Sequence, residues 1–569
     1  MMDYNKLADL LFPAITKKPE DWLAAFPKRD LPEGAKVTRL GPSPTGFIHL
    51  GNLYGAFTDE RLAHQSGGIF FLRIEDTDDK REVEGAVEAV ITSLDYFGVH
   101  FDEGAIGGIS EAGGKSADVG QYGPYYQSDR AEIYQTFAKE LIRKGLAYPC
   151  FCTEEENAAL REQQEAEKAN PGYHGKWAKC RNLTMEEIEA NVAAGKPFVL
   201  RFRTAGIDLS TADLTDAEKA AHSFTVQDGI RGALTMPENY LDVVLLKQNG
   251  IPTYHFAHTI DDHLMGTTHV IRGEEWLSSL PIHVDLFGAL GWEPPVYCHT
   301  TVLMKMDGEN KRKLSKRKDP ELSLNYYRQE GYHADAVREY LLTILNSNFE
   351  EWRIANPDAS WEEFNFTTEK MSSSGTLFDL DKLNDVSKDV LVKKSSEELY
   401  QFLLQWSQEF RPELYAIYSA NPEKMLAILN MDRTGDKPRK DLVFAGQIAE
   451  FISYFFDETY KVQDSFPAEV PAEDVPKILT AYLEGYDPAD DNSQWFAKIR
   501  TLGEELGYAG KPKDFKKNPD QFKGHVGHVS TVIRVALMGR QNSPDLWTIQ
   551  QIMGEEMTRA RIEGALKNL

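Results

Sequence analysis

Two short segments of the chain combine residue types that bind phosphate and stabilise charge on it. In PSPTGFIHLGN (42–52), His49 precedes Gly51 where a strand is expected to turn into a helix. Helix N-termini present unpaired N–H groups to phosphate, and a histidine there can donate to phosphoryl oxygens. In KRKLSKRK (311–318), six of eight residues are Lys or Arg, although the chain carries a formal charge of −26. Taken singly, the first segment is also typical of any α/β turn, and the second of a solvated basic turn or a nuclear-localisation-like tract.

Together the two segments resemble the HIGH-type and KMSKS-type signatures of class I aminoacyl-tRNA synthetases. The sequence between them agrees as well, and over residues 37–330 the chain is similar to the bacterial-type glutamyl-tRNA synthetases. The C-terminal half matches more loosely, and residues 1–35 are interpreted as an N-terminal extension. The ordered motifs that carry the resemblance are TRLGPSPTGFIHLGN, LRIEDTD, GPYYQSDR, PTYHFAHTIDDHLMGTTHVIRGEEWLSSLPIH and KLSKRK.

This resemblance implies that ATP, as its Mg²⁺ complex, and L-glutamate are substrates. The glutamate carboxylate attacks the α-phosphate and expels pyrophosphate, so catalysis rests on positioning and on stabilising growing negative charge. The catalytic roles fall to His49, Lys313 and Lys316, with the lysines on a mobile loop. The lysine loop is then basic because the reaction puts negative charge beside it. The implied ATP contacts are His49, Gly51, Asn52, Lys313, Ser315 and Lys316.

A second set of residues is implied to select the amino acid. Glu75 is expected to pair with the α-amino group, and Arg39 and Arg272 to address the side-chain carboxylate, which a guanidinium binds in a bidentate manner. Taken alone, LRIEDTD also fits a solvated acidic turn, and Arg272 a surface salt bridge with Glu274 or Glu275. His258 departs from the smaller residue common in the family, and no role is assigned to it. The implied glutamate-binding residues are Arg39, Ser43, Glu75, Tyr254 and Arg272.

Three cysteines form a candidate zinc site. Some members of the family bind zinc through a CxC pair, a later cysteine and a His or Tyr, and tetrahedral zinc needs four ligands. Here Cys150, Cys152 and Cys180 qualify, whereas the position two after the third cysteine is Asn182. Either Tyr173 or His174 supplies the fourth ligand, or the site is degenerate and the cysteines are reduced core residues.

The elements that must position these residues predict an α/β protein. A strand, a Gly/Pro turn and a helix over 37–57, followed by a strand at 68–76, open a Rossmann-type parallel sheet. An inserted connective module interrupts it, and an all-α anticodon-binding region follows. The expected segments are an N-terminal extension (1–35), the first half of the catalytic domain (36–130), the insert (131–240), the second half with the KLSKR loop (241–325), a stem-contact region (326–395) and the helical anticodon-binding region (396–569).

Composition limits the class of protein further. No apolar run approaches the roughly 20 residues that cross a bilayer, and the N-terminus lacks the pattern of a signal peptide, so we expect a cytoplasmic protein without membrane contact. Four cysteines argue against a disulfide framework. The acidic balance argues against general nucleic-acid binding, yet basic segments at 435–440 and 511–523 could contact an RNA backbone. No role follows for the glycine-rich stretch 104–123.

The resemblance therefore predicts a glutamate–tRNA ligase, a monomer acting on tRNA(Glu). Two alternatives stay open. One is a non-discriminating form that also charges tRNA(Gln), or a glutaminyl enzyme; the Arg39/Arg272 pair favours glutamate. The other is a catalytically silent tRNA-binding paralogue, a class that usually loses the triphosphate-handling residues present here.

Overall fold

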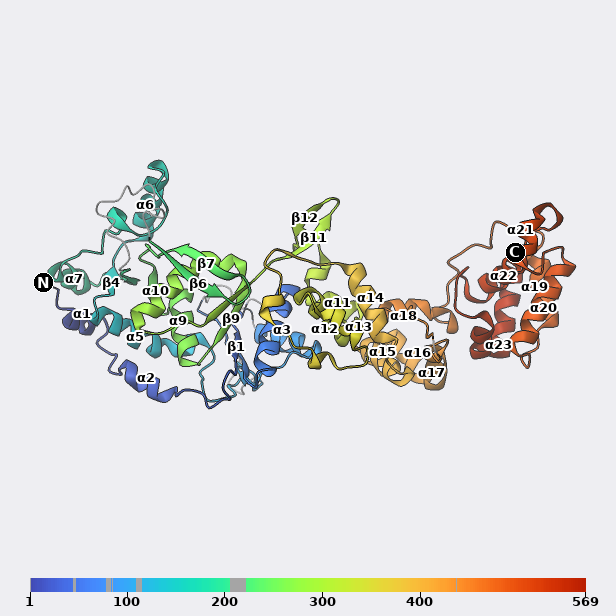
Figure 1. Ribbon diagram of the computed structural model, residues 1–569, viewed down its shortest axis with the longest axis horizontal. Helices are drawn as coiled ribbons and strands as arrows, with labels where there is room; N and C mark the ends of the chain where they lie inside the picture. Colours follow the sequence, from blue (N-terminus) through green and yellow to red (C-terminus); the bar gives the residue numbers. More distant parts are fainter. Residues whose placement is uncertain are drawn as a thin grey trace. The chain divides into compact units, whose positions relative to one another are not determined.

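The computed structural model describes residues 2–44, 48–77, 83, 85–108, 115–204, 222–435 and 437–569. The chain forms two compact units: Met1–Leu324 with Leu341–Asp379, and Asn325–Tyr340 with Leu380–Leu569. Figure 1 labels their helices and strands. The turn residues 45–47, the last residue of LRIEDTD and the middle of the 104–123 stretch lie outside the described residues. The six segments expected from the sequence are finer than these two units and stay a prediction.

The first unit is built on parallel strands, as the sequence predicts. One group runs in the order β1-β2-β3 and the other pairs β10 with β9, all parallel. The Thr268 N–H donates to Val37 O at 2.9 Å, which sets β9 beside β1. The strands are β1 (Val37–Leu40), β2 (Ile69–Leu72), β3 (Glu103–Gly104), β9 (His269–Gly273) and β10 (Val296–Thr300). Their burial is near-continuous and includes polar residues such as Thr38 and Arg39, as expected for a parallel sheet that is covered on both faces.

Helices cover this sheet, and α3 (Leu50–His64) is the most deeply enclosed. It packs against β1, β2 and β9, and its residues Leu53, Ala56 and Phe57 are fully buried. The start of α3 is therefore fixed with respect to the carboxyl ends of the strands, where ligands bind in open parallel sheets. The other helices of this part are α4 (Ala86–Tyr96), α9 (Tyr254–Leu264) and α10 (Leu280–Leu290).

The inserted module contains its own antiparallel sheet in the order β4-β5-β8. The boundary predicted between the insert and the second catalytic half is residue 241. β8 (Val244–Leu246) lies after this boundary, yet it pairs with β5 of the insert. A short apolar run predicts a buried strand but does not name its partner. The elements of the module are α5 (Ala131–Arg143), β4 (Ala147–Cys150), α6 (Glu154–Ala166), α7 (Met185–Ala193), β5 (Val199–Phe202), β6 (Ser223–Asp228), β7 (Gly232–Pro237) and β8 (Val244–Leu246).

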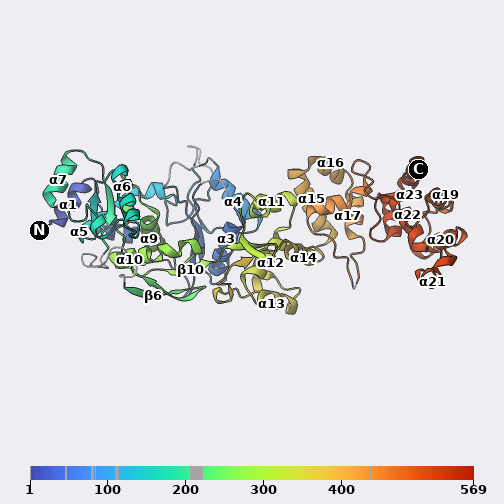
Figure 2. The same ribbon diagram turned by 90° about the horizontal axis from the view of Figure 1, so that it is seen from above.

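The hairpin β6–β7 reaches from the module to the catalytic sheet. β6 lies beside β10 (Figure 2), and the Gly229 N–H in the hairpin turn donates to Tyr297 O at 2.7 Å. The insert is thereby attached next to the end of β10. The same hairpin carries Asp228, the last residue of β6.

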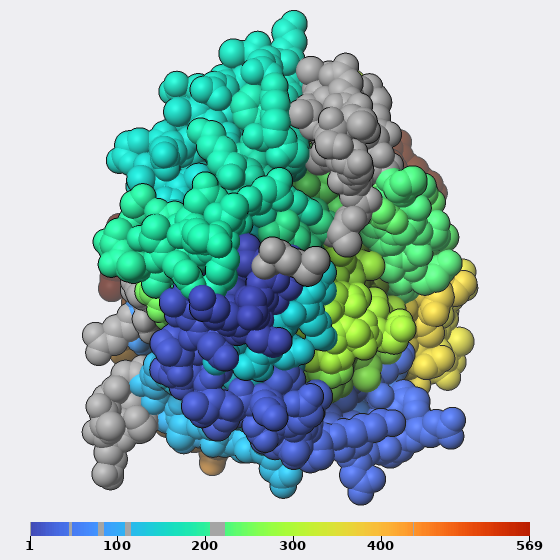
Figure 3. Space-filling view, turned by 90° about the vertical axis from the view of Figure 1, so that its left-hand side faces the viewer, coloured from blue at the N-terminus to red at the C-terminus, as the bar shows by residue number. Residues whose placement is uncertain are grey.

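The N-terminal extension is an integral part of the first unit. It forms α1 (Tyr4–Leu11) and α2 (Pro19–Ala25) and lies directly against the insert, as the dark blue segment in Figure 3 shows. The Lys139 ammonium of α5 donates to Phe12 O at 2.9 Å and to Ile15 O at 2.8 Å. These contacts cap the carbonyls between α1 and α2 and fix the extension on α5.

The basic segment begins as a β-hairpin. β11 (Leu303–Asp307) pairs antiparallel with β12 (Asn310–Lys313), and the short β13 (Thr376–Leu377) joins β11 in parallel. Residues 311–313 are therefore strand and 314–318 the turn that follows. The sequence analysis treated the whole segment as a loop, since its charge hides the strand pattern.

The second unit is helical, with no strand assigned among its described residues. Its core gathers apolar side chains from residues 391–562. Trp406, Tyr454 and Phe455 are buried in it, so these aromatic rings pack the core and do not form a surface for stacking bases. No helix in the described ranges is long and apolar enough to cross a membrane. The other α-helices assigned among the described residues are α11 (Leu324–Glu330), α12 (Ala334–Leu345), α13 (Phe349–Ala355), α14 (Leu380–Leu391), α15 (Ser396–Phe410), α16 (Pro412–Ala420), α17 (Pro422–Asn430), α18 (Ala445–Phe451), α19 (Val475–Gly485), α20 (Asn492–Glu505), α21 (Pro512–Lys517), α22 (Val526–Met538) and α23 (Leu546–Lys567).

Candidate active site

A cavity of about 530 Å³ opens at the carboxyl ends of β1, β9 and β10, between the start of α3 and the basic hairpin. Such a position is where open α/β sheets bind ligands. Ser315 is not among the lining residues. The residues that the sequence analysis selected and that line the cavity are Arg39, Ser43, His49, Gly51, Asn52, Glu75, Tyr254, Arg272, Lys313 and Lys316.

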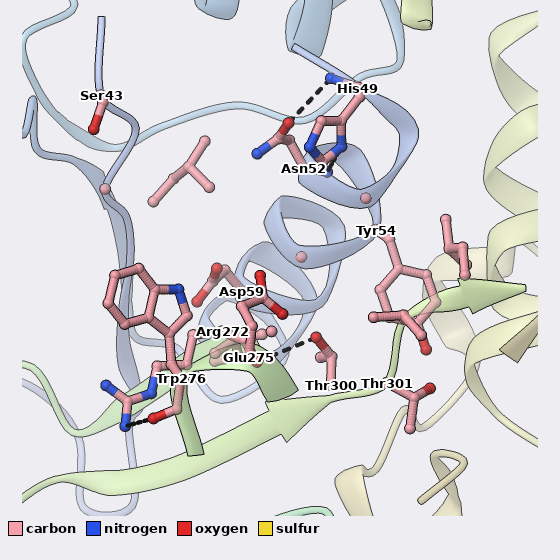
Figure 4. A pocket seen from close by; sticks show the side chains of 18 of the residues that line it. Ser43, His49, Asn52, Tyr54, Asp59, Arg272, Glu275, Trp276, Thr300 and Thr301 are labelled. Atoms are coloured by element: carbon pink, nitrogen blue, oxygen red, sulfur yellow. Dashed lines mark hydrogen bonds between the residues drawn. The ribbon is translucent and has the colours of Figure 1, made fainter. Parts of the chain in front are cut away.

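One end of the cavity is formed by the first turn of α3, where Figure 4 shows His49 and Asn52. The two residues make reciprocal caps: the His49 N–H donates to Asn52 Oδ1 at 3.0 Å, and the Asn52 N–H donates to His49 Nδ1 at 3.3 Å. A Cβ on Gly51 would lie 3.0 Å from the His49 ring. This geometry fixes the imidazole over the helix N-terminus and leaves Nε2 outside the capping interaction.

The basic hairpin forms the facing wall, and its cations divide into two groups. Arg312 is held by Asp319 through bonds of 2.6 and 2.8 Å, and the Ser315 N–H donates to the same carboxylate at 2.8 Å. Lys313 and Lys316 line the cavity instead. Asp319 therefore acts as the anchor that shapes the turn, and Ser315 contributes to the turn through its backbone.

His49 is electrostatically linked to this wall. Burial lowers the pKa of His49, and the nearby positive charges of Lys316 and Lys313 lower it further. The imidazole is consequently neutral at pH 7 in the absence of an anion. Three groups able to donate to phosphate thus surround one end of the cavity.

At the other end, two buried arginines share one carboxylate. Asp262 Oδ1 accepts from Arg73 Nη1 at 2.6 Å and from Arg39 Nε at 3.3 Å. Arg73 also donates to Glu75 Oε1 at 3.1 Å. Although burial opposes it, the two guanidinium groups hold the pKa of Asp262 well below its usual value. Glu75 is buried strongly enough for its pKa to rise despite Arg73 and Arg39.

Aromatic rings enclose this end. Tyr254 packs on Trp276 with ring centroids 4.4 Å apart and on His258 at 5.6 Å. His258, which received no role, is fully buried behind Tyr254, with Nδ1 2.8 Å from Asp262 Oδ2 and Nε2 3.0 Å from the Tyr297 hydroxyl. It does not line the cavity. Its imidazole is part of the buried core and contacts Asp262, the carboxylate that pairs with Arg39.

Arg272 does not form the surface salt bridge considered as an alternative. It is buried, and Glu274 pairs with Arg231 at 2.5 Å instead. Arg272 donates to His299 Nε2 and to His283 Nδ1, each at 2.9 Å, and more weakly to Trp276 O at 3.4 Å, the dashed line in Figure 4. The histidines come from β10 and α10.

Several cavity residues were missed by the sequence analysis. Trp276 was quoted only as part of a motif, Glu275 was named only as an alternative partner of Arg272, and Asp59 lies mid-helix in α3, where nothing marks it. Burial raises the pKa of Asp59 well above its usual value, against the lowering effect of Arg39. Arg73 and Asp262 were available in LRIED and TIDDH, but their pairing spans 189 residues and has no local signal.

The cysteine cluster lies in the insert, at the end of β4. The three sulfur atoms lie within 4.8 Å of one another, with Cys152 and Cys180 3.6 Å apart. The Tyr173 hydroxyl is 3.4 Å from Cys150 Sγ and 3.5 Å from Cys152 Sγ. His174 turns away, its Nε2 lying 2.9 Å from Asn170 O. Hydrogen bonds from Cys152 and Cys180 lower the pKa of the Cys150 thiol, and the bond with Cys150 raises the pKa of both Cys152 and Cys180. Without a metal the three sulfurs therefore favour a single thiolate, on Cys150.

The basic segments of the second unit are partly neutralised by the protein. Lys440 pairs with Asp389 at 2.9 Å and Lys523 with Asp474 at 2.8 Å. Lys516 and Lys517 lie at the exposed end of α21. Position 436 lies outside the described residues. An RNA contact at either segment stays a prediction.

Comparison with known proteins places these features in context. Residues 36–385 match the family described as "tRNA synthetases class I (E and Q), catalytic domain", and residues 439–566 match "Anticodon binding domain". The glutamate–tRNA ligase of Acetivibrio thermocellus is 60% identical over 568 residues, covering 99% of this chain and 100% of that protein. The glutamate–tRNA ligase of Sorangium cellulosum is 43% identical, covering 96% and 98%. A crystal structure of a glutamate–tRNA ligase from Elizabethkingia meningosepticum in complex with its amino acid superposes with a TM-score of 0.70 at 27% identity, covering 94% of this chain and 99% of that one.

Proposed function

The chain belongs to the glutamate–tRNA ligase family of class I aminoacyl-tRNA synthetases, and from this premise we propose how its own residues activate glutamate and charge tRNA(Glu) for protein synthesis. Glutamate and MgATP form glutamyl-adenylate and pyrophosphate. The glutamyl group then passes to the 3′-terminal adenosine of the tRNA. The observation that supports this assignment is one cavity lined by phosphate-binding groups at one end and carboxylate-binding groups at the other.

At the phosphate end, His49, Lys313 and Lys316 bind the triphosphate from opposite walls. As the glutamate carboxylate forms its bond to the α-phosphorus, the bond to pyrophosphate breaks and charge grows on the phosphoryl oxygens. The two lysines neutralise that charge, and His49 donates to it through Nε2–H. Mg²⁺ enters with ATP and is held chiefly by phosphate oxygens and water, so it needs no dedicated protein cage.

Near the start of α3 the helix surface is open. A Cβ on Gly55, which lines the cavity, would meet nothing within 4 Å. We assign this face to the nucleoside part of ATP, with Gly51 and Asn52 beside it. Ser315 supports the turn through its backbone bond to Asp319 and is assigned no direct ATP contact of its side chain.

At the amino-acid end, Glu75 receives the α-ammonium group, and Arg39 and Arg272 bind the side-chain carboxylate. Ser43 and Tyr254 complete the polar lining. Glutamine would present an amide N–H₂ in place of one carboxylate oxygen and leave a buried guanidinium donor unpaired, which is how such sites discriminate by about 10⁴. The carboxylate nucleophile is already ionised at pH 7, so activation needs no general base.

Pyrophosphate release that depends on glutamate and tRNA(Glu) tests this assignment. Lys316→Ala should lower the rate about 10²–10³-fold, the loss typical of one contact made to transition-state charge. Lys311→Ala, which removes an exposed charge on the same hairpin outside the cavity, is the matched control and should retain most activity. Equal effects of the two substitutions, or release that needs no glutamate, would contradict the proposal.

Whether tRNA(Gln) is also charged is a separate question. We propose a discriminating enzyme for the amino acid, because two arginines face the carboxylate end of the cavity. Charging purified tRNA(Glu) and tRNA(Gln) side by side with labelled glutamate tests the tRNA choice. Glutamyl-tRNA(Gln) as a product would identify the non-discriminating form. Binding of both tRNAs without pyrophosphate release would identify a silent paralogue.

We further propose that the cysteine cluster holds a structural zinc ion. Two sulfur atoms bound to one tetrahedral zinc lie about 3.8 Å apart, close to the 3.6 Å between Cys152 and Cys180. Tyr173 supplies the fourth ligand, since its hydroxyl lies nearest to the sulfurs, and His174 does not. When bound, the ion cross-links the end of β4 to the turn containing Cys180 and has no part in the reaction.

A further inference from the structure

Arg272 is held only by neutral acceptors. Three of its five N–H groups are used, by His299 Nε2, His283 Nδ1 and the Trp276 carbonyl. Within the described part of the chain no carboxylate forms an ion pair with it. Arg39 and Arg73 differ, since both face Asp262. Of the two arginines that line the cavity, Arg39 is paired with a carboxylate, whereas Arg272 contacts only neutral acceptors among the described residues.

These contacts fix the tautomer of each histidine. A guanidinium donates and does not accept in proteins, so His299 Nε2 and His283 Nδ1 must both be unprotonated. His299 then carries its proton on Nδ1 and donates to Asp228 Oδ2 at 2.6 Å. His283 carries its proton on Nε2 and donates to His255 Nδ1 at 3.0 Å. Each ring that touches Arg272 is oriented by a second residue behind it.

Asp228 is itself held in one orientation. Its Oδ1 accepts the N–H groups of Ile230 and Arg231, each at 2.9 Å, in the turn of the β6–β7 hairpin. Its Oδ2 faces His299. The two carboxylate oxygens therefore have different tasks, one closing the hairpin turn and the other fixing the histidine.

We propose that Asp228–His299 and His255–His283 are positioning pairs for glutamate recognition: they aim Arg272 at the substrate's side-chain carboxylate while leaving its positive charge undivided. This inference rests on the proposed role of Arg272. The specificity of the cavity then depends on a hairpin of the inserted module, whose Asp228 lies 71 residues from His299 in the sequence.

The surroundings keep both rings neutral. Burial lowers the pKa of His283 well below its usual value, helped by His258, Arg272 and His255 and opposed by Asp262. Burial also lowers the pKa of His299, with Asp228 opposing and Arg272 and Arg231 assisting. Tyr254 and Tyr297 face His283, and Tyr297 faces His299. Neutral rings persist at pH 7 and are lost as the pH falls through these lowered values.

Asp228→Asn is the sharpest test, because it preserves shape, reverses the 2.6 Å hydrogen bond to the His299 ring and removes only one further bond to Oδ2, the longer one from the His299 N–H at 3.2 Å. The N–H groups of Ile230 and Arg231 hold the amide oxygen of the variant at the position that Oδ1 of Asp228 occupies, so the amide N–H₂ faces His299 Nδ1. The imidazole of His299 must then accept at Nδ1 and carry its proton on Nε2. Two donors, His299 Nε2–H and the Arg272 N–H, then face each other, and their hydrogen bond is lost. We expect KM for glutamate to rise at least about tenfold, the size of one lost bond to a charged group, while KM for ATP is unchanged.

Two substitutions of His299 distinguish its role as a hydrogen-bond acceptor for Arg272 from its role in packing. His299→Gln can keep an oxygen acceptor near the Nε2 place and should retain most glutamate affinity. His299→Leu keeps bulk and loses the acceptor, so it should match or exceed the Asp228→Asn defect. Glutamine, tested as a competing substrate, should gain relative to glutamate in both defective variants.

Asp102→Asn is the matched control, because it alters another Asp–His pair, with His64 at 3.0 Å, outside the cavity. It should leave both KM values unchanged. Wild-type enzyme that fails to charge tRNA with glutamate would overturn the proposed function. Wild-type enzyme that charges, together with Asp228→Asn and His299→Leu enzymes of unaltered glutamate KM, would overturn the positioning pairs alone. A rise in both KM values with a lowered melting temperature would assign these residues to folding and would also contradict the inference.

Discussion

Gly41 and Glu75 lie so close that a Cβ atom on Gly41 would stand 2.9 Å from the carboxyl carbon of Glu75. The glycine follows β1, and the glutamate follows β2, the next strand of the same sheet. The Glu75 N–H also donates to Pro42 O at 3.0 Å. The absence of a side chain at position 41 is therefore what permits the Glu75 carboxylate to point into the cavity.

Gly41→Ala should displace Glu75 and weaken its bond to the substrate's α-ammonium group. We expect KM for glutamate to rise about tenfold or more, with KM for ATP little changed, in glutamate-dependent pyrophosphate release. Gly288→Ala is the control, since this exposed glycine of α10 has nothing within 4 Å of the added carbon. It should leave activity intact. A Gly41→Ala enzyme with a normal KM for glutamate would show that Glu75 does not bind the substrate.

The pKa of His49 should respond to the nucleotide. Without ligand, burial and the charges of Lys316 and Lys313 lower it, so the ring is neutral above that lowered value. A bound triphosphate offsets the lysines and favours the protonated ring. A non-hydrolysable MgATP analogue should therefore raise the pKa.

Histidine-selective NMR titration measures this change directly, and a His49→Gln variant assigns the resonance. His100, an exposed histidine paired with Asp95 on α4, serves as an internal reference and should not shift. If the analogue leaves the His49 pKa unchanged or lowers it, the imidazole does not face the polyphosphate.

Asp262 should be essential for folding of the first unit. Its replacement by Asn leaves Arg73 and Arg39 buried with one fewer negative charge. Removing one partner of a buried ion pair typically costs about 3–5 kcal/mol, and we expect a loss of that size in the free energy of unfolding, measured by urea titration. Asp95→Asn breaks an exposed Asp–His pair and should change it by less than about 0.5 kcal/mol. Comparable losses in the two variants would show that Asp262 does not stabilise the arginines.

The sequence predicts elements well where the signal is local. β1 and α3 follow from a β-branched run, a Gly/Pro turn and helical spacing, and the structure confirms both. The residues predicted to bind phosphate and glutamate were selected through their motifs, and the fold brings ten of them to one cavity.

What escaped prediction depends on pairing over long distances. Nothing near Asp228 indicates that it orients His299, because a carboxylate in a hairpin turn is ordinarily explained by the turn itself. No local sequence signal distinguishes His283 and His299 from other buried histidines. The role proposed for them rests on the direction of the hydrogen bonds from Arg272, which only the folded structure shows. The partner of β8 was missed for the same reason, since strand pairing is a tertiary property.

The zinc proposal leads to a test that does not depend on activity. Purified protein should contain one zinc ion per chain, and Cys180→Ser should lose it, because a hydroxyl binds zinc far more weakly than a thiolate. Cys298→Ala changes a buried thiol outside the cluster and should retain the metal. Tyr173→Phe distinguishes the fourth ligand: it should weaken retention against a chelator, whereas His174→Asn should not. Metal content is read by mass spectrometry after dialysis. A wild-type chain that stays free of zinc after refolding with excess metal would show that the three cysteines are reduced residues of the core and not metal ligands.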